Sequence, residues 1–443
     1  MSGVERSERR LHLGISVSSA WTGGTAWRRP DSRVEDLNGA PLFIQIAQDA
    51  ERAGLDFVFR ADGLHLDRER LDRHPGGLLD PVPILAAIAA TTSRIGLVGT
   101  ASTSFDEPYN LARAFGTLDL VSEGRAGWNI VTSQVGERNY GQEEVADHEE
   151  RYARAEEFVD TVRELWGSWP RESILIDREN GRYADTSRIR PIDHHGRFFD
   201  VEGPLNIPTS AQGAPVLFQA GASERGRAFA GTHADAVFAA TADESVAREL
   251  TSDLHARATA AGRPVGSLAV LPGAHLYIAD TDAQAQALYR EIRADDDIVD
   301  GYERLERTFG IDFRGLGLDD RVPAEFLPAV GSLRTSQTHA ERFRALFVDE
   351  GLTLRTVIRD HVLTGAGHWR IVGSPEQVAD AIAHRFLTEA DDGNVFIPGA
   401  YPETFRLFFE AVVPLLKDRR LFRREYEGTT LREHLGIRRP ALG

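Results

Sequence analysis

Short apolar runs recur along the chain, and each is followed by an amphipathic stretch long enough to form a helix. The runs are nearly continuous in apolar residues, which is typical of strands buried on both faces. The predicted strands are 11–18, 55–59, 94–102, 126–133, 215–221, 234–240, 268–279 and 393–399. The predicted helices are 41–54, 81–93, 110–124, 147–166, 223–234, 243–262, 281–293 and 402–417. This alternation indicates an α/β protein with a parallel sheet.

Eight strand–helix units are the number found in a (β/α)8 TIM barrel, and we predict that fold with insertions. A doubly wound sheet is the alternative, but it usually carries a glycine-rich phosphate fingerprint after its first strand, and no G-x-G-x-x-G occurs here. We expect one barrel domain over 11–437. It is interrupted by a loop-rich insertion at 169–213 and a partly helical one at 294–368, which we interpret as a lid or an interface.

Polar or small residues follow several predicted strands where these end. They occupy 60–63, 100–103, 129–134 and 219–223. In a βα barrel the carboxyl ends of the strands meet at one face, where the active site forms. We therefore expect these residues, including Thr132 and Ser133, to line one shared mouth.

The helix over 223–234 begins beside this mouth with features suited to an anion. Gly221 forms the turn after the strand, and Ser223 takes the N-cap position. The free amides of the first helical turn can then bind an anion. An ordinary N-cap serine is the alternative interpretation.

A second helix start, with Asp147 as its cap, has His148 and Tyr152 one turn apart on the same face. Both side chains can donate hydrogen bonds to a phosphate or a ribityl chain, near the positive end of the helix dipole. In isolation, such a pair is more often explained by surface packing. Two such helix starts at one mouth indicate a phosphorylated cofactor.

Composition narrows the class of protein. The 443 residues are 42% hydrophobic and 27% charged, as in globular proteins with a large core. An excess of 68 acidic over 51 basic residues, net −17, disfavours nucleic-acid binding. No apolar run approaches the roughly 20 residues of a membrane span, and the N-terminus shows no signal-peptide pattern. We expect a cytoplasmic protein without a membrane partner.

Missing residue types exclude several chemistries. The absence of cysteine excludes a thiol nucleophile, an iron–sulfur cluster and a thiolate zinc site. Lys417 is the one lysine, in a charged helix end, which disfavours a pyridoxal Schiff base, and no P-loop occurs. The neighbouring His194 and His195 match no metal-binding spacing, and we predict no metal and a structural role for them.

Several segments resemble one known family. They are 26–30, 55–64, 99–113, 122–133, 148–158, 193–238 and 425–436. Through them the chain resembles the flavin-dependent monooxygenases of the bacterial-luciferase-like superfamily, in the subgroup of nitrilotriacetate monooxygenase component A and dibenzothiophene-sulfone monooxygenase. The resemblance runs nearly end to end.

The resemblance implies a two-component enzyme. Its βα barrel would take reduced FMN from a separate NAD(P)H-dependent flavin reductase. Oxygen would add at flavin C4a, and the peroxyflavin would oxidise a small organic substrate. A homo-oligomer is also implied.

The same resemblance implies roles for individual residues. Asp62 and Thr100 would lie beside the isoalloxazine, His148 and Tyr152 would hold the ribityl phosphate, and Ser223 with the Gly221 turn would hold the phosphate. Asn129 and Ser133 are further candidates for cofactor binding, and either could simply satisfy backbone groups at the strand end.

One departure from the family concerns the substrate. Many relatives carry paired histidines after the first strand, where this chain has Trp21 to Gly24. We expect an apolar substrate, cyclic or bearing sulfur or halogen, with Trp21, Phe105 and Trp128 as candidate contacts, although Trp128 could equally be core. A chelator with several carboxylates would need several cations, and Arg60 and Arg125 are the candidates near strand ends.

Other functions remain open at this point. A deazaflavin-dependent oxidoreductase of the same superfamily would transfer hydride instead of activating oxygen. A metal-dependent barrel hydrolase and a non-catalytic flavin-binding protein are further alternatives. Cofactor binding and metal analysis would separate them.

Overall fold

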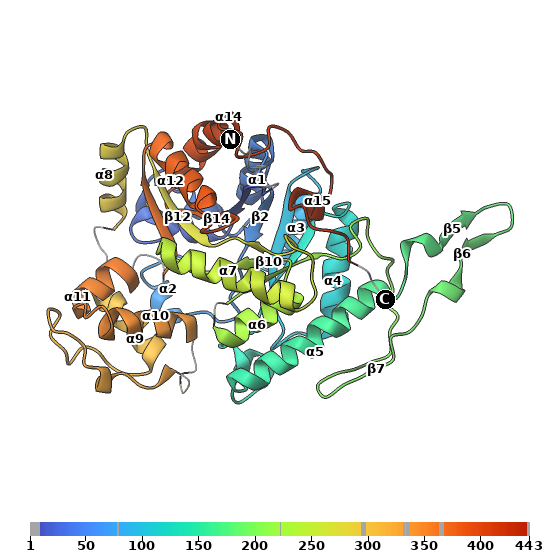
Figure 1. The fold of residues 1–443 in the computed structure, drawn as a ribbon, viewed down its shortest axis with the longest axis horizontal. Helices are drawn as coiled ribbons and strands as arrows, with labels where there is room; N and C mark the ends of the chain where they lie inside the picture. The colour runs from blue at the N-terminus through green and yellow to red at the C-terminus, as the bar shows by residue number, and fades with distance from the viewer. Residues whose placement is uncertain are drawn as a thin grey trace, which may run out of the picture.

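A computed structural model describes residues 9–77, 79–221, 223–293, 298–330, 333, 337–362 and 367–440. Within them, ten parallel strands form one sheet in the order β11-β10-β9-β4-β3-β2-β1-β14-β12-β13 (Figure 1). The strands are β1 (His12–Ser16), β2 (Phe57–Arg60), β3 (Gly96–Ser102), β4 (Ala126–Val131), β9 (Val216–Ala220), β10 (Ala236–Phe238), β11 (Ala269–Val270), β12 (Gly273–Ile278), β13 (Trp369–Gly373) and β14 (Gly393–Pro398). All eight predicted strands are present, the seventh of them split into β11 and β12.

The sheet closes into a ring through the segment that contains β11 and β12. Val270 bonds on one side to β10, and its carbonyl accepts from Asp392 N at 2.9 Å on the other side, next to β14. Two residues later the Pro272 carbonyl accepts from Val395 N at 3.1 Å. Since β14 also pairs with β1, the eight strands form a closed barrel. The predicted (β/α)8 fold is confirmed.

The eight predicted helices are also present. They are α1 (Pro41–Ala53), α3 (Pro81–Ala89), α4 (Pro108–Val121), α5 (His148–Gly167), α6 (Glu224–His233), α7 (Glu244–Ala260), α8 (Asp282–Ile292) and the run α13 (Glu403–Leu407), η10 (Phe408–Val412) and α14 (Val413–Asp418). Short helices occupy the connections: η1 (Ser19–Thr22), η2 (Ala26–Arg28), η3 (Val34–Asp36), α2 (Arg68–Leu71) and η4 (Glu137–Tyr140). Among the described residues, no helix is long and apolar enough to cross a membrane.

An additional βα unit, β13 with α12 (Pro375–Leu387), follows the second insertion. β13 pairs with the outer part of β12, from Ala274 opposite Trp369 to Ile278 opposite Gly373. Ser374 begins α12 with a capping box that includes Gln377. The unit lies outside the eight-stranded ring and was not among the predicted pairs.

Alternate residues of each barrel strand face two different cores. Outward residues such as Leu13 and Leu97 pack with the surrounding helices, whereas inward residues such as Val98 and Phe218 fill the barrel. The helix α15 (Leu431–His434) closes the amino-terminal end of the barrel. Its Leu431 lies so close to Gly96 that a Cβ there would be 2.4 Å from a leucine methyl. The opposite end is therefore the one left for a ligand.

The segment 169–213 holds two small hairpins and two short helices. These are η5 (Arg171–Ser173), β5 (Ile174–Asp177) with β6 (Arg182–Ala184), η6 (Thr186–Arg188), and β7 (His194–His195) with β8 (Asp200–Val201). The β5–β6 hairpin extends away from the body of the protein (Figure 1), with Leu175, Ile176 and Tyr183 exposed on it.

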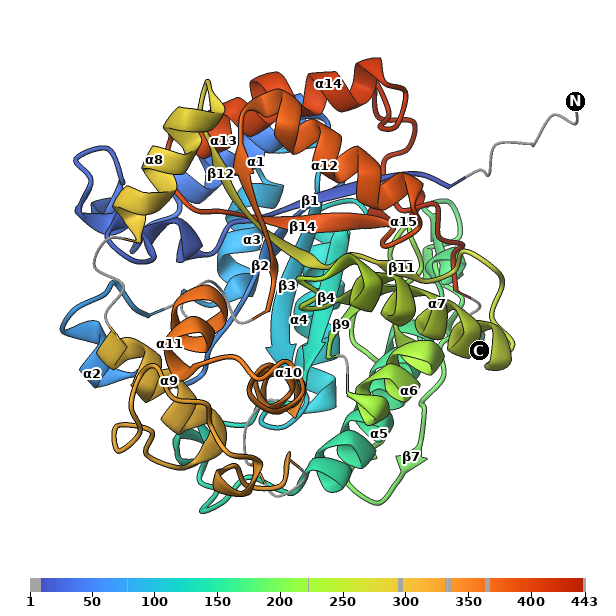
Figure 2. The ribbon, with the colours of Figure 1, turned by 60° about the vertical axis from the view of Figure 1, so that its left-hand side comes forward.

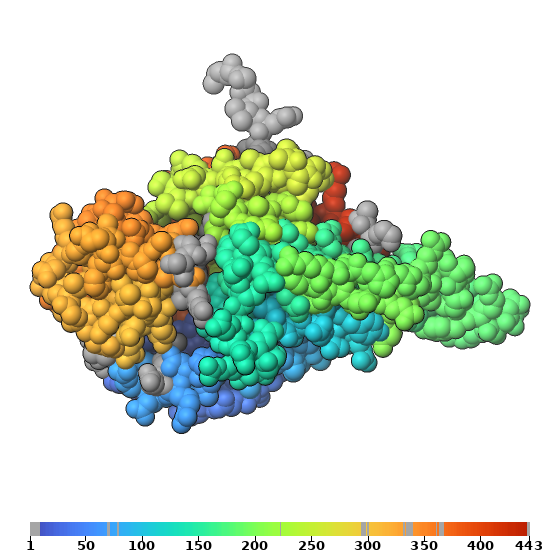
Figure 3. Space-filling model, turned by 90° about the horizontal axis from the view of Figure 1, so that it is seen from below, coloured from blue at the N-terminus to red at the C-terminus, as the bar shows by residue number. Residues whose placement is uncertain are grey.

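The segment 294–368 contains α9 (Ile298–Phe309), η7 (Ala324–Phe326), α10 (Gln337–Val348), α11 (Leu354–Val357) and η9 (Ile358–Val362). These helices have a hydrophobic core of their own, which includes Leu305, Phe313 and Phe347. They form a separate mass at the end of the molecule opposite the β5–β6 hairpin (Figure 3). They lie on the side of the barrel toward which the arrowheads of β3 and β4 point (Figure 2).

Candidate functional site

Ser223, Tyr152 and two glycines form a small cradle where β9 leads into α6. The Ser223 hydroxyl caps α6 and accepts from Gly226 N at 3.2 Å. Gly221 has φ 152°, a backbone conformation that side chains disfavour. A Cβ at Gly221 would lie 3.2 Å from the Tyr152 hydroxyl, and one at Gly226 would lie 2.9 Å from it. The glycines thus leave the first turn of α6 open beside a buried phenol.

Tyr152 comes to this cradle from α5. Asp147 caps that helix by accepting from Glu150 N at 2.8 Å, as expected from the sequence. The His148 and Tyr152 rings are 4.9 Å apart, so the two residues do share a face. Burial raises the pKa of the Tyr152 phenol, and hydrogen bonds with Ser223 and Thr132 act in the opposite direction. The phenol stays protonated at neutral pH and is available as a donor.

Arg225 lies next to the cradle, in ion pairs with Glu156 and, at 3.4 Å, with Glu149. Its guanidinium lies 5.7 Å from the centre of the Tyr152 ring. Two bonds of 2.7 and 2.9 Å to the Glu156 carboxylate fix its position, and that carboxylate raises the arginine pKa. Residue types and helix ends together make this corner suited to a phosphate group.

Thr100 and Asn129 lie in the barrel interior. The Asn129 amide nitrogen donates to the Thr100 hydroxyl at 2.9 Å, and both residues are buried. The Asn129 Oδ1 atom has no hydrogen-bond partner among the described residues, nor has Gln219 Oε1 on the neighbouring strand β9. A buried polar atom without a partner is costly, which favours a ligand group at this position.

Asp62 lies on the opposite side of the mouth, just after β2. Its carboxylate accepts from Gly63 N at 2.8 Å. Burial raises its pKa, and the nearby Asp80 carboxylate raises it further. Burial raises the pKa of Asp106, and Asp80 and Asp62 raise it further, so the three carboxyl groups form an acidic edge after β2 and β3. The structure therefore separates Asp62 from the Tyr152–Ser223 cradle.

Ser133 follows β4 at the mouth and is partly exposed. Its carbonyl accepts from the Ser104 hydroxyl at 3.2 Å, which ties the loops after β3 and β4 together. This contact fits the interpretation that Ser133 has a structural role at the strand end. Cofactor binding by its hydroxyl stays a prediction.

The structure corrects the expectation that Trp21 contacts the substrate, and it supports the core interpretation of Trp128. Trp21 and Trp128 are fully buried in the outer cores, against Phe43 and Phe115 respectively, because both point away from the barrel interior. Phe105 stacks on Tyr140 with ring centres 4.9 Å apart, and its contact with a substrate stays a prediction.

Neither predicted cation is available to a substrate. Arg60 donates to the carbonyls of Val17 and Leu79 at 2.9 and 3.1 Å. Arg125 precedes β4 and lies at the closed end of the barrel, where it donates to the Ile95 carbonyl at 2.9 Å. Buried arginines of this kind hold loops together.

His194 and His195 occupy the β7 hairpin. His194 lies 3.3 Å from the Glu157 carboxylate, and His195 lies 2.7 Å from Asp200. The described residues contain no cluster of His, Asp and Glu able to hold a metal ion. The structural interpretation of the two histidines agrees with these contacts.

Sequence reasoning missed two other histidines. His275 lies in β12, whose Ala274, Leu276 and Ile278 pack outward, so His275 faces the interior. Its ring centre is 5.8 Å from that of His368, just before β13. The sequence did contain a signal for His275, because a histidine interrupts the apolar stretch Gly-Ala-His-Leu-Tyr-Ile.

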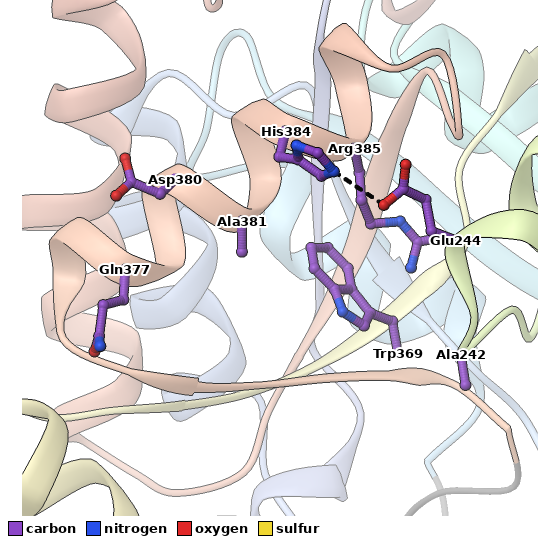
Figure 4. A pocket seen from close by; sticks show the side chains of 8 residues that line it. All are labelled: Ala242, Glu244, Trp369, Gln377, Asp380, Ala381, His384 and Arg385. Carbon is purple, nitrogen blue, oxygen red and sulfur yellow. Dashed lines mark hydrogen bonds and ion pairs between the residues drawn. The ribbon is translucent and has the colours of Figure 1, made fainter.

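A groove of about 450 Å³ lies elsewhere, between α12 and the start of α7 (Figure 4). It is lined by Ala242, Glu244, Trp369, Gln377, Asp380, Ala381, His384 and Arg385. Trp369 packs against the outer core, and His384 pairs with Glu244 at 3.0 Å. The groove is on the outside of β13, away from the strand ends, and the reaction site is not placed there.

Comparison with known proteins agrees with this geometry. The luciferase-like monooxygenase family matches residues 25–391. N-acetyl-S-(2-succino)cysteine monooxygenase of Bacillus subtilis is 38% identical, over 98% of each chain. Nitrilotriacetate monooxygenase component A of Aminobacter aminovorans is 37% identical, also over 98% of each chain.

Among solved structures, riboflavin lyase with modified FMN and the substrate riboflavin superposes with a TM-score of 0.86 and 32% identity, covering 97% of this chain and 96% of that one. The family match spans most of the chain, and the similarity to these relatives runs end to end. The chain therefore belongs to the luciferase-like monooxygenase family of flavin-dependent enzymes.

Proposed function

We propose that this protein is the oxygenase of a two-component system. It takes reduced FMN from a separate NAD(P)H-dependent flavin reductase and uses O2 to oxidise a small organic substrate. The observation that carries the proposal is the cradle of Tyr152, Ser223, Gly221 and Gly226 at the mouth of a closed barrel. Two comparisons support it: one relative is named as a component A, and one neighbour holds a modified FMN.

The residues present fit FMN at both ends. At the phosphate end, the α6 amides, the Ser223 hydroxyl and the Tyr152 phenol would supply donors. The two glycines keep free the space that a Cβ would fill. At the ring end, Asn129 offers an unpartnered acceptor inside the barrel, the group that a ring N–H requires.

The remaining roles follow from position. Thr100 would orient the Asn129 amide, His148 and Ser133 would contact the ribityl chain, and Asp62 would contact the ring from the other side of the mouth. Reduced flavin, when bound, supplies the electrons that activate O2. The chain's task is to hold it and to exclude water.

Aromatic residues keep the barrel interior dry. Phe59 lies 5.1 Å from Phe238 and 6.4 Å from Phe218, and the three line the lumen below the mouth. The segment 294–368 acts as a lid over them. The substrate fits as an apolar body, cyclic or bearing sulfur or halogen, against these rings.

An anaerobic titration with photoreduced FMN, followed by a pulse of oxygenated buffer, tests the proposal. We expect tighter binding of reduced than of oxidised FMN, and after the pulse a long-lived spectrum distinct from both. Ser223→Ala and Tyr152→Phe should each weaken binding of reduced FMN about tenfold or more, because each removes a hydrogen bond to a charged group.

Matched controls are Ser187→Ala and Tyr183→Phe, which lie in the distant insertion and should leave affinity unchanged. Equal effects of the cradle and control variants would remove the proposed phosphate site. Binding of a deazaflavin in preference to FMN, with no oxygen-dependent spectrum, would favour the hydride-transfer alternative.

A further inference from the structure

Gln219, near the end of β9, carries a buried amide beside the cradle. The residue is 2% exposed, and its Oε1 atom has no hydrogen-bond partner among the described residues. An acceptor buried in this way loses its hydrogen bonds to water and gains none in exchange, which is unfavourable. A donor on a bound molecule would remove that cost.

The register of the sheet shows which way Gln219 points. It pairs with Ile130 of β4 and Val237 of β10, and both of these pack in the outer layer beneath the helices. Paired residues of parallel strands point to the same face, so Gln219 faces the helices and not the interior that Phe218 fills. Packing does not explain an amide on this face, because an apolar side chain would fill the same space at lower cost.

The amide reaches the space that Gly221 leaves open. A Cβ at Gly221 would lie 2.9 Å from Gln219 Nε2 and 3.2 Å from the Tyr152 hydroxyl. A Cβ at Gly226 would lie 2.9 Å from the same hydroxyl and 3.2 Å from Ser223 Oγ. Three polar side chains, from β9, from α5 and from the cap of α6, therefore border one small space beside the first turn of α6.

Arg225, the cation beside this space, is already paired. Its guanidinium is bonded to Glu156 at 2.7 Å and lies 3.4 Å from Glu149. An anion in the cradle therefore depends on uncharged donors, and a hydrogen bond from such a donor to an anion is among the stronger ones. The Gln219 amide is a donor of this kind.

We propose that Gln219 binds the flavin where its phosphate joins the ribityl chain. The Nε2 atom donates to a phosphate oxygen, and Oε1 accepts from a ribityl hydroxyl. A glutamine amide carries both a donor and an acceptor, as this junction requires. The inference rests on the proposed function, and it adds a residue of the strand itself to the cradle formed by Tyr152 and Ser223.

The test compares three photoreduced flavins, each titrated anaerobically into the full-length protein. FMN has the phosphate and the ribityl chain, riboflavin lacks the phosphate, and lumiflavin lacks both. Gln219→Leu removes the donor and the acceptor, whereas Gln219→Glu at about pH 8 keeps an acceptor and removes the donor. Gln286→Leu, on the outer helix α8, is the matched control and should change no affinity.

We expect Gln219→Leu to weaken FMN about tenfold and riboflavin about threefold, because a hydrogen bond to a charged group contributes more than one to a hydroxyl. Gln219→Glu should weaken FMN by about tenfold or more and riboflavin by less than about twofold, since a carboxylate repels the phosphate and still accepts from the ribityl hydroxyl. Lumiflavin should bind equally to all variants. Ratios between flavins within one variant do not depend on how much of that protein is folded.

An equal loss for all three flavins would mean that Gln219 only supports the fold, and an unchanged FMN affinity in either variant would also overturn its role. The same titrations with oxidised FMN test the proposed function separately. If the variants discriminate between the flavins but reduced FMN binds no more tightly than oxidised FMN, the proposed function is wrong and the amide contact stands. If reduced FMN is preferred and the variants do not discriminate, only the role of Gln219 is wrong.

Discussion

At the scale of single residues, the cradle depends on the absence of side chains at its glycines as much as on the side chains of Tyr152 and Ser223. Gly226 lies within α6, where glycine is a poor helix former, yet a Cβ there would lie 2.9 Å from the Tyr152 hydroxyl and 3.2 Å from Ser223 Oγ. We infer that room beside the Tyr152 phenol matters more at this position than a residue of higher helix propensity.

Gly226→Ala should consequently have opposite effects on two quantities. Alanine raises intrinsic helix propensity by up to about 1 kcal/mol, while the added methyl displaces the phenol and weakens binding of reduced FMN several-fold. Thermal unfolding and the anaerobic titration measure the two effects. Thr232→Ala, on the same helix and exposed, is the control; unchanged FMN affinity in Gly226→Ala would contradict the cradle.

At the scale of elements, the 294–368 segment combines a separate hydrophobic core with a polar attachment to the barrel. Arg342 on α10 pairs with Asp243 before α7 at 2.8 Å, and Arg73 after α2 pairs with Glu303 on α9 at 3.4 Å. Exposed ion pairs contribute little each, about 0–1 kcal/mol. Such contacts can open and re-form without unfolding either part.

If this segment is a lid, Arg342→Gln should leave folding intact and loosen closure. We expect the share of reduced FMN lost as hydrogen peroxide to rise two- to threefold, because water reaches the barrel more often. Peroxide is measured against product or against total oxygen consumed. Arg248→Gln, which breaks an exposed pair within α7, is the control, and equal peroxide yields would reject the lid.

At the scale of the whole molecule, Asp119 links parts distant in the sequence. From α4 it accepts from Ala126 N at 3.0 Å and from Gln212 Nε2 at 2.6 Å, and it also bonds to Ser210. Gln212 in turn accepts from Arg432 N, at the start of α15. Burial raises the pKa of Asp119 to about 6, although these hydrogen bonds act to lower it.

This shift has a defined sign for stability. The folded carboxyl holds its proton more tightly than the unfolded one, so its contribution is fully present below pH 3.8 and is lost as pH rises through about 6. The difference in free energy of unfolding between the protein and Asp119→Asn should fall by about 2 kcal/mol between pH 4 and 6.5, which is most of what a shift of about two pKa units contributes. Urea unfolding measures it, with the exposed Asp418→Asn as control. If the difference in free energy of unfolding does not change with pH, the raised pKa of Asp119 is wrong.

The homo-oligomer implied by family resemblance stays a prediction at this scale, and sedimentation velocity would test it. The exposed apolar side chains of the β5–β6 hairpin are the part of the surface to substitute first.

The sequence by itself determined the barrel and its functional end. Apolar runs and amphipathic stretches are local patterns, and eight such pairs leave few other folds. Ser223 and Asp147 were predictable as caps for the same reason, because capping depends on neighbours in the chain. The helix starts around them also led to the prediction of a phosphorylated cofactor, which stays a prediction.

Only the tertiary structure decided which way side chains point and what they meet. Trp128 and Asn129 are adjacent, yet one is outer core and the other lies in the lumen, since strand residues alternate between faces. His275 and His368 are 93 residues apart in number and meet only because β12 and β13 pair. Contacts between elements depend on packing that no local pattern encodes.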